Sequence, residues 1–186
     1  IIERGETLCL IIGVSSFENF GDLPNTKKDA EALNKILNDK YKTTTIYLED
    51  PTYSEFYNEL SQIQDNRYVF KEGSQFLLFA ASHGAKDRWG ASQLIFTDSY
   101  RDQHLQGEYH NTFSMSRFKN VLSNLKSTNT LLILDVCFAG NIFDDLIACG
   151  EIEQDTIPES NPLFTTRFSP RAPSYKNLLQ KETNLF

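Results

Sequence analysis

The chain has 186 residues, of which 40% are hydrophobic and 23% are charged, as is usual for a globular domain. This length is sufficient for one domain with a sizeable core. The formal net charge of −7 disfavours nucleic acid and anionic membranes as partners, because both attract basic surfaces. The three cysteines form no CxxC pair and no disulfide-type spacing, which predicts a reducing, cytoplasmic environment and no structural zinc.

Strands and helices alternate along the first third of the chain. Residues 8–14 are apolar and predict a buried strand, but they are too short to span a bilayer and have no basic leader before them. A helix is predicted to begin near Thr26, because apolar side chains recur at helical spacing from Ala30 to Leu37. The β-branched residues 43–48 then predict a second strand, and residues 53–65 a second helix.

The same alternation continues after residue 75. Residues 76–82 predict a third strand, which ends at His83-Gly84. A polar excursion follows over residues 85–111 with a brief strand at 93–96, and a third helix is predicted over 114–125 with Ser114 as its cap. Residues 131–134 predict the fourth strand. This order predicts an α/β fold with a mainly parallel sheet and helices on both faces.

The pattern weakens after Gly140. Residues 142–148 and 176–180 fit short helices, whereas residues 151–173 show no clear periodicity. We therefore predict a first domain over residues 1–150, followed by a loop and the remnant of a C-terminal portion over residues 151–186. A first residue of Ile rather than Met indicates a fragment, a processed product or an excised domain.

Reactive side chains follow the third and fourth predicted strands. His83 follows the third strand, and Asp135 and Cys137 follow the fourth. Because the carboxyl ends of neighbouring parallel strands share one edge of a sheet, we expect this imidazole and this thiol to open into one crevice. A lone cysteine is more often a small hydrophobic residue than a nucleophile, and this is the interpretation favoured for Cys9 and Cys149.

In this order, the motifs of the chain resemble those of the caspase-like cysteine peptidases, and of metacaspase-like and bacterial members more than animal caspases. The spacing of 54 residues between His83 and Cys137 is near the value of about 50 noted for caspases. Ala139 stands where the family's Asp-x-Cys-x-Ser-Gly motif usually has Ser, and the Gln-Ala pair of animal caspases is absent. The matching segments are Ile11-Ile12-Gly13-Val14, Asp29-Ala30-Glu31-Ala32-Leu33, Ser82-His83-Gly84 and Leu134-Asp135-Val136-Cys137-Phe138-Ala139-Gly140.

The resemblance implies a caspase-like three-layer sandwich in which only residues 158–186 stand for the family's smaller C-terminal half. It also implies a cysteine endopeptidase in which Cys137 attacks the peptide carbonyl and His83 transfers protons. The backbone N–H groups of Gly84 and Cys137 would form the oxyanion hole. Glycine at position 84 would let the substrate carbonyl approach closely.

Specificity for a basic residue is a further implication of the resemblance. In metacaspase-like proteins, an Asp two residues before the cysteine and another at the start of the first helix line an acidic pocket; here these are Asp135 and Asp29. A pair of carboxylates attracts a guanidinium or an ammonium group, so cleavage after Arg or Lys is predicted. Two alternatives stay open: Asp29 could complement the helix dipole, and Asp135 could be an ordinary solvated strand end.

This chemistry requires no cofactor and no metal. Some metacaspases need calcium, and His104 and His110 lie near acidic residues, although a solvated loop is favoured over a metal site there. The expected partners are a protein or peptide substrate and a regulatory partner or attached domain, without contact to nucleic acid or membrane. Arg167 and Arg171 offer basic sites for self-processing. The acidic residues that would permit calcium binding are Asp87, Asp98, Asp102, Asp144 and Asp145.

Two other functions compete with the peptidase. The main alternative is a catalytically inactive caspase-like domain that serves as a regulatory or scaffold module. A flavodoxin-like nucleotide binder could share the same kind of sheet. However, neither GxGxxG nor GxxxxGK(S/T) follows the first predicted strand, so phosphate binding has no support in the sequence.

Overall fold

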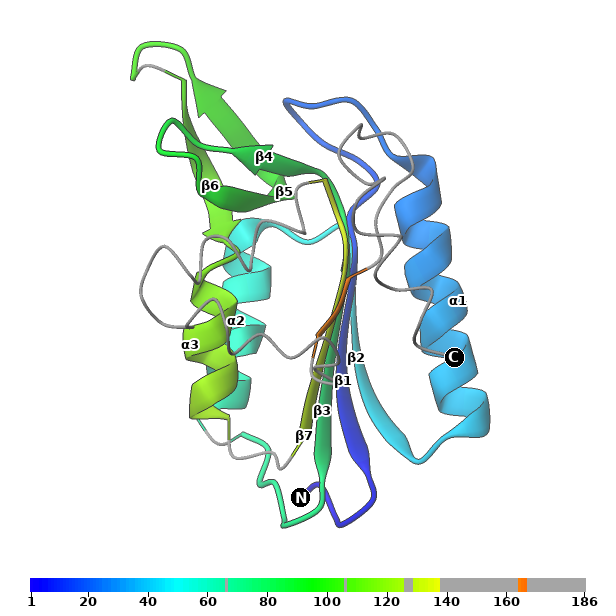
Figure 1. The fold of residues 1–186 in the computed structure, drawn as a ribbon. Coiled ribbons are helices and arrows are strands. Elements are labelled where there is room, and N and C mark those ends of the chain that lie inside the picture. Colours follow the sequence, from blue (N-terminus) through cyan, green and yellow to red (C-terminus); the bar gives the residue numbers. More distant parts are fainter. Residues whose placement is uncertain (66, 106, 126–128, 138–163, 167–186) are drawn as a thin grey trace, which may run out of the picture.

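The computed structural model describes residues 1–65, 67–105, 107–125, 129–137 and 164–166. In this part of the chain, a five-stranded parallel sheet has the order β2-β1-β3-β7-β8. Figure 1 shows it edge-on, with the carboxyl ends of the strands at the top. Its strands are β1 (Thr7–Gly13), β2 (Thr43–Glu49), β3 (Gln75–Ala81), β7 (Asn129–Asp135) and β8 (Phe164–Thr166).

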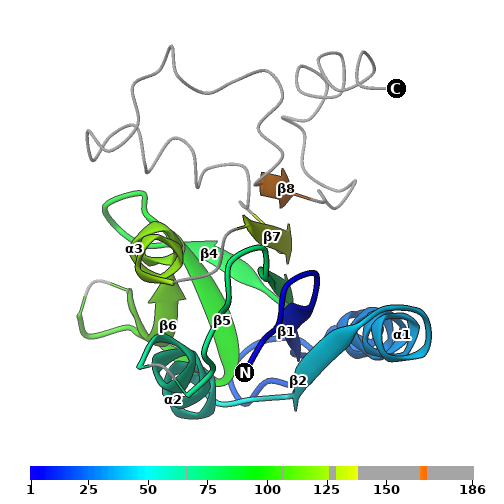
Figure 2. The same ribbon diagram turned by 90° about the horizontal axis from the view of Figure 1, so that it is seen from below.

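Helices cover both faces of this sheet (Figures 1 and 2). Helix α1 (Pro24–Lys40) lies on one face, and α2 (Tyr53–Gln64) and α3 (Arg117–Asn124) lie on the other. Strand β1 is buried on both sides: Leu10 packs in the core beneath α2 and α3, and Cys9 packs in the core beneath α1. The predicted three-layer α/β sandwich with a mainly parallel sheet is therefore confirmed.

A second, antiparallel sheet extends beyond the carboxyl ends of the parallel strands (Figure 1). It has the order β4-β5-β6, formed by β4 (Gly84–Lys86), β5 (Ser92–Asp102) and β6 (Glu108–Ser114). The prediction of a polar excursion with one brief strand at 93–96 was wrong, because the described residues of this region form three strands and the strand at 93–96 is part of the longer β5. The polar half of β5 pairs with β6, where the ring of Tyr100 stacks on that of His110 with centroids 4.9 Å apart. Cross-strand pairing of this kind stabilises strands without an apolar run.

Two predicted helix starts differ from the structure. Helix α1 begins at Pro24 rather than near Thr26, because proline is preorganised for the first helical position. The Thr26 hydroxyl lies within the helix and donates to the carbonyl oxygen of Val14 at 2.6 Å. Helix α3 begins at Arg117, since Ser114, the predicted cap, is the last residue of β6. The Ser114 hydroxyl instead shares a hydrogen bond of 2.8 Å with that of Ser116.

Strand β8 comes from the segment that was predicted to lack regular structure. Leu132, Ile133 and Leu134 of β7 pair in parallel with Phe164, Thr165 and Thr166. Three residues are too few to show a periodicity, which is why the sequence pattern gave no sign of this strand. The helices predicted at 142–148 and 176–180 and the motif residues Ala139-Gly140 lie outside the described residues. Within the described residues, no helix combines the length and apolar character that crossing a membrane requires.

A capping box begins helix α2. The Thr52 hydroxyl accepts from the backbone N–H of Glu55 at 3.2 Å, and the Glu55 carboxylate accepts from the backbone N–H of Thr52 at 2.8 Å. We expect Thr52→Ala to lower the free energy of unfolding by about 1 kcal/mol, because one helix N–H loses its acceptor. Urea denaturation measures this loss. Ser54→Ala, at an exposed position of the same helix turn, is the matched control and should leave stability nearly unchanged.

The pH dependence of this cap gives the test a second readout. Hydrogen bonds from the Thr52 backbone and hydroxyl lower the pKa of Glu55. A carboxyl whose folded-state pKa is lowered stabilises the fold above its unfolded pKa of about 4.3, and the contribution is lost as pH falls through the folded value. Thr52→Ala removes the hydroxyl that donates to the Glu55 carboxylate, whereas the backbone N–H of Thr52 still donates to it. The part of the stability difference that comes from the hydroxyl–carboxylate bond should therefore be present near neutral pH and be lost below about pH 4. A stability difference that increases below pH 4 would contradict this role of the hydroxyl.

Candidate active site

His83 and Cys137 follow neighbouring strands at the same level of the sheet. Strands β3 and β7 pair in parallel with Ala81 opposite Asp135, and each reactive residue comes two positions later. The N–H of Ser82 still donates to the carbonyl oxygen of Asp135 at 3.3 Å, which extends the pairing past the last registered residues. The two strand ends therefore bring the imidazole residue and the thiol residue to the same edge of the sheet, as the sequence predicted.

Gly84 contacts the backbone of Cys137 directly. A Cβ atom at position 84 would lie 1.9 Å from the carbonyl oxygen of Cys137 and 2.9 Å from its carbonyl carbon. No side chain can occupy that space unless the backbone of Gly84 or that of Cys137 moves. The sequence suggested that glycine at this position gives room to the substrate carbonyl. The structure adds a closer constraint, because glycine is needed for the strand ends themselves to meet.

The Gly84 amide lies on the outer edge of the second sheet. The carbonyl oxygen of His83 accepts from the N–H of Ile95 at 3.1 Å, and the hydroxyl of Ser82 donates to the carbonyl of Ile95 at 2.6 Å. Gly84 is opposite Leu94, the next pair along the antiparallel ladder. Because hydrogen-bonded and non-hydrogen-bonded pairs alternate, the N–H of Gly84 points away from β5.

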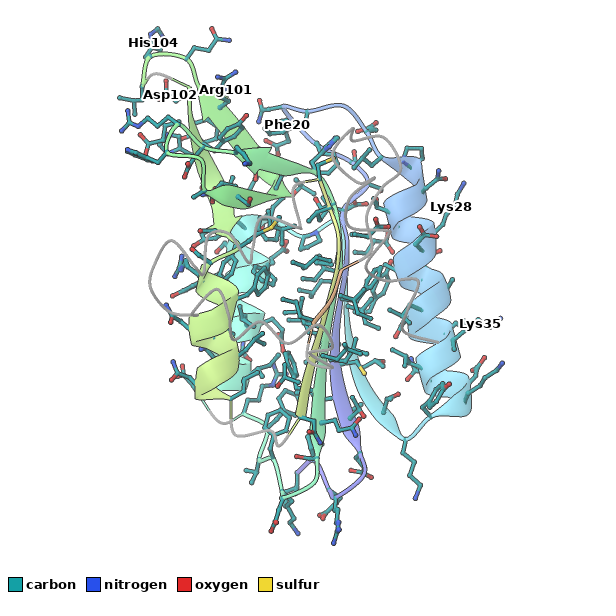
Figure 3. All side chains as sticks on the ribbon, viewed as in Figure 1. Phe20, Lys28, Lys35, Arg101, Asp102 and His104 are labelled. Atoms are coloured by element: carbon teal, nitrogen blue, oxygen red, sulfur yellow. The ribbon has the colours of Figure 1, made fainter. Side chains whose placement is uncertain are left out.

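The imidazole of His83 is held by the loop that follows β1. Its Nε2 lies 2.7 Å from the carbonyl oxygen of Gly21. Its ring centroid lies 4.7 Å from that of Phe17 and 6.2 Å from that of Phe20, and Figure 3 shows Phe20 at this end of the sheet. A carbonyl oxygen only accepts, so Nε2 must carry the proton of this hydrogen bond. In the neutral ring, Nδ1 is then the basic nitrogen.

Sequence reasoning missed Phe17, Phe20 and Gly21 as parts of the site. The segment between β1 and α1 contains asparagine, glycine and aspartate, which are typical of turns and do not by themselves indicate a site. The feature of the sequence that could have indicated this role is the presence of two phenylalanines among mostly polar loop residues. Phe17 is only 8% exposed, so it is anchored rather than solvated, and it can fix the orientation of a neighbouring ring.

The two described cysteines have opposite environments. Cys137 is exposed, whereas Cys9 is fully buried in β1. Burial raises the pKa of the Cys9 thiol to about 12, so it stays protonated and unreactive at neutral pH. This agrees with the interpretation of Cys9 as a small hydrophobic residue. Cys149 lies outside the described residues.

Asp135 lies on the α1 face of the sheet. Side chains alternate along a strand, and Ile133 of β7 packs beneath α1 while Leu134 packs in the opposite core. Asp135 therefore shares the face of Ile133, at the carboxyl end of β7, where it is half-buried. This position fits both a carboxylate that lines a pocket and the solvated strand end that was left open as the alternative.

Asp29 lies on the flank of α1 that is turned toward β3 and β7. Ala30 packs on the sheet over Gly13, whose added Cβ would lie 2.7 Å from that of Ala30. Lys27 forms an ion pair with Glu49 at the end of β2, which marks the β2 flank of the helix. Residues two apart on a helix are separated by about 200°. Asp29 therefore lies on the opposite flank from Lys27, on the same side of α1 as β7.

The alternative role for Asp29, as a partner of the helix dipole, does not fit its position. The first turn of α1 contains no acidic residue, and Asp29 lies beyond it. The dipole effect falls off within that first turn. Lys28, the preceding residue, points away from the sheet (Figure 3). Asp29 and Asp135 thus lie on one face of the sheet at its carboxyl edge, and both are accessible to solvent.

His110 lies in the second sheet with a buried Nε2 that has no hydrogen-bond partner within the part of the chain that the structure describes, and His104 lies in the hairpin turn. His110 stacks on Tyr100, and the backbone N–H of His104 donates to the Asp102 carboxylate at 2.7 Å in the turn between β5 and β6. Figure 3 shows His104 at the tip of this hairpin, far from the carboxyl edge of the parallel sheet. Among the described residues, no group of three or more His, Cys, Asp or Glu side chains has the geometry to hold a metal ion.

The arrangement of a thiol residue and an imidazole residue at one edge of a parallel sheet is accompanied by a match to a known family. A family model of the caspase domain matches residues 6–182. The chain therefore belongs to the caspase-domain family, a family of cysteine peptidases, and the resemblance found in its motifs is confirmed at this level. A comparison with curated protein sequences found no significant match.

Solved structures also include similar folds. The crystal structure of caspase-1 from Spodoptera frugiperda matches with a TM-score of 0.48 and 12% sequence identity. The match covers 73% of this chain and 48% of the caspase-1 chain. The chain thus spans about half the length of this structural relative.

Proposed function

We propose that the chain is a cysteine endopeptidase that cleaves after Arg or Lys, with Cys137 as nucleophile and His83 as general acid and base. The observation that carries this proposal is the contact between the backbones of Gly84 and Cys137, where an added Cβ would lie 1.9 Å from the Cys137 carbonyl oxygen. This contact fixes the residue after His83 against the residue that bears the thiol. Family membership supports the same class of chemistry.

The proposed reaction has two steps. The Cys137 thiolate attacks the carbonyl carbon of the scissile bond, the C–N bond breaks, and the imidazolium of His83 gives its Nδ1 proton to the departing amine. Water then attacks the thioester while Nδ1 takes up a proton, which releases the carboxylic acid and restores the thiolate. The hydrogen bond from Nε2 to the Gly21 carbonyl, 2.7 Å long, supports this assignment because it leaves Nδ1 to exchange protons.

The N–H groups of Gly84 and Cys137 are the proposed donors to the oxyanion. The position of Gly84 in β4 supports its role, since its N–H points away from β5. A donor aimed at the developing negative charge contributes on the order of 3 kcal/mol to transition-state stabilisation in well-studied hydrolases. The proposed chemistry uses side chains and backbone alone, without a required cofactor, and the acidic residues of the chain would permit calcium binding.

Specificity for a basic side chain is proposed from the two carboxylates. Asp29 and Asp135 share one face and one edge of the sheet, so a guanidinium placed between them would meet negative charge from two elements. A pocket for an acidic side chain would need a cation instead, and residues 13–25 contain no Arg or Lys. With this specificity, self-processing would occur at Arg167 or Arg171. The cytoplasmic location of the protein stays a prediction.

The experiment compares peptides that end in Arg, Lys or Asp before a fluorogenic leaving group. We expect hydrolysis of the Arg and Lys peptides and none of the Asp peptide. Asp135→Asn and Asp29→Asn should each lower kcat/KM for the Arg peptide by about 10- to 100-fold, the value of one lost charge-assisted hydrogen bond. Asp39→Asn, at an exposed position on the same helix as Asp29, is the matched control.

Each outcome of this experiment has a distinct meaning. A preference for the Asp peptide would contradict the acidic pocket but not the assignment of Cys137 as the nucleophile. A substitution at Asp39 as harmful as one at Asp29 would reduce the specificity claim to a general charge effect. A folded protein that hydrolyses none of the peptides, with or without calcium, would favour the inactive regulatory or scaffold domain.

A further inference from the structure

Asp50 has a backbone conformation that L-amino acids rarely adopt. It follows the last residue of β2 with a φ of 45°, and Asn111 is the other non-glycine residue with a positive φ in the described part of the chain. Strain of this kind persists only where the surroundings fix it. Neither the proposed nucleophile nor the proposed acidic pocket uses this residue.

The carboxylate of Asp50 binds the start of the loop formed by residues 14–23. Its Oδ1 accepts from the backbone N–H of Ser15 at 2.6 Å and from that of Ser16 at 3.0 Å. The hydroxyl of Ser15 lies 3.0 Å from Oδ1 and 3.1 Å from Oδ2. The backbone N–H of Asp50 donates to the carbonyl of Gly13 at 2.9 Å. One residue therefore holds the chain on both sides of the point where β1 becomes the loop.

The same loop carries the groups that hold His83. Phe17 follows Ser16 directly, and its ring lies 4.7 Å from the imidazole, while the Gly21 carbonyl lies 2.7 Å from Nε2. The loop is closed on itself, because the N–H of Leu23 donates to the carbonyl of Ser15 at 2.8 Å. Asp50 thus anchors the start of the segment directly, and the end of the segment is joined to that start by the hydrogen bond between Leu23 and Ser15.

Strand β5 also holds this loop, so the loop connects the antiparallel sheet to the parallel sheet. The N–H of Glu18 donates to the carbonyl of Thr97 at 3.0 Å, and Nδ2 of Asn19 donates to the carbonyl of Ser99 at 3.0 Å. Both acceptors belong to β5 of the antiparallel sheet, whereas Asp50 directly follows β2 of the parallel sheet. Loss of the Asp50 carboxylate would leave the β5 contacts in place, so we expect the loop to shift as a unit rather than unfold.

We infer that Asp50 is a positioning residue of the active site, which sets the orientation and tautomer of His83 through residues 14–23. This inference rests on the proposed function for its effect on catalysis, but the link from Asp50 to the imidazole is independent of it. The carboxylate suits the role because an anionic oxygen accepts from two successive backbone N–H groups and a hydroxyl at once. The hydrogen bond from Nε2 to Gly21 then exists only while the loop is held.

The test uses variants that separate the carboxylate from the backbone strain. Asp50→Gly adopts a positive φ freely and removes the acceptor, whereas Asp50→Asn keeps one acceptor oxygen and tolerates the same φ. We expect Asp50→Gly to lower kcat for an Arg peptide by at least about 10-fold with KM changed less than about twofold, because a displaced catalytic group affects the chemical step. Asp50→Asn should recover part of that loss. Asn111→Gly, the same change at the other positive-φ position, is the matched control.

The second readout is the ¹⁵N NMR spectrum of the His83 ring in a Cys137→Ala background, assigned with His83→Gln. We expect the Nε2–H tautomer with Asp50 present and a mixture with the Nδ1–H tautomer in Asp50→Gly. An unchanged ring in Asp50→Gly, or an unchanged kcat in an active enzyme, would overturn the inference. A changed ring without any Cys137-dependent hydrolysis would support the link and overturn the proposed function. If Asp50→Gly does not fold, both kcat and the His83 tautomer are measured in Asp50→Asn instead, with the same changes expected at smaller size.

Discussion

Replacing Cys137 with alanine is expected to abolish peptide hydrolysis, with kcat/KM lowered by at least about 10⁴-fold. Without the sulfur no thioester can form, and the remaining oxyanion donors and binding contacts give only residual catalysis. Steady-state hydrolysis of an Arg-terminated fluorogenic peptide measures the loss. His83→Ala should have a loss of similar size, because the proposed nucleophile and the proposed base would act as one unit, and the double variant should be no worse than either single one.

Cys9→Ala is the matched control for the nucleophile. Cys9 is a fully buried thiol in the centre of β1, so its loss should lower stability and leave kcat/KM within about twofold of wild type. Activity that persists in Cys137→Ala but disappears in Cys9→Ala would contradict the assignment. Additive losses in the double variant of Cys137 and His83 would show that the two side chains do not act together.

Gly84→Ala should be the most damaging change that removes no functional group. The added methyl would lie 1.9 Å from the carbonyl oxygen of Cys137, so the ends of β3 and β7 must separate. We expect kcat/KM to fall on the order of 100-fold, as a displacement of about 1 Å at a reacting group does. The free energy of unfolding should fall by about 2 kcal/mol, which is typical of overpacking.

Gly73→Ala provides a comparable change away from the site. Its φ is 81°, an added Cβ would lie 2.9 Å from Cγ of Arg4, and it precedes β3 at the amino edge of the sheet. This variant should lose stability but keep kcat/KM within about twofold, since the strand ends at Cys137 are untouched. Equal loss of activity in both variants would mean that activity follows general stability rather than the Gly84–Cys137 contact.

The parallel sheet could be predicted because its central strands, β1 and β3, are buried on both faces. Strands β1, β3 and β7 each contain a continuous apolar run, which ends at Gly13 in β1, at Asp135 in β7 and at Ser82 directly after β3. The antiparallel sheet was underestimated because β5 becomes polar after Phe96 and is stabilised by pairing with β6. Strand β8 has only three residues and depends wholly on its neighbour β7. Pairing between distant segments leaves no local periodicity to detect.

The candidate site was predictable to the extent that it is built from strand ends. His83 and Cys137 could be placed together because parallel strands end at one edge. The loop that holds the imidazole could not be predicted, since Phe17 and Gly21 act through a ring contact and a backbone carbonyl. Asp50 acts through backbone N–H groups of Ser15 and Ser16. Such contacts depend on tertiary geometry and have no sequence spacing of their own.

The central claim is that the exposed thiol of Cys137 and the imidazole of His83 form one catalytic pair. The most direct test is intact-mass measurement after incubation with a peptidyl acyloxymethyl ketone that ends in Arg. We expect a single adduct on Cys137, formed at a rate that falls sharply in His83→Ala and is reduced in Asp135→Asn. An adduct on another cysteine, or labelling of Cys137 at the same rate in His83→Ala as in wild type, would contradict the account.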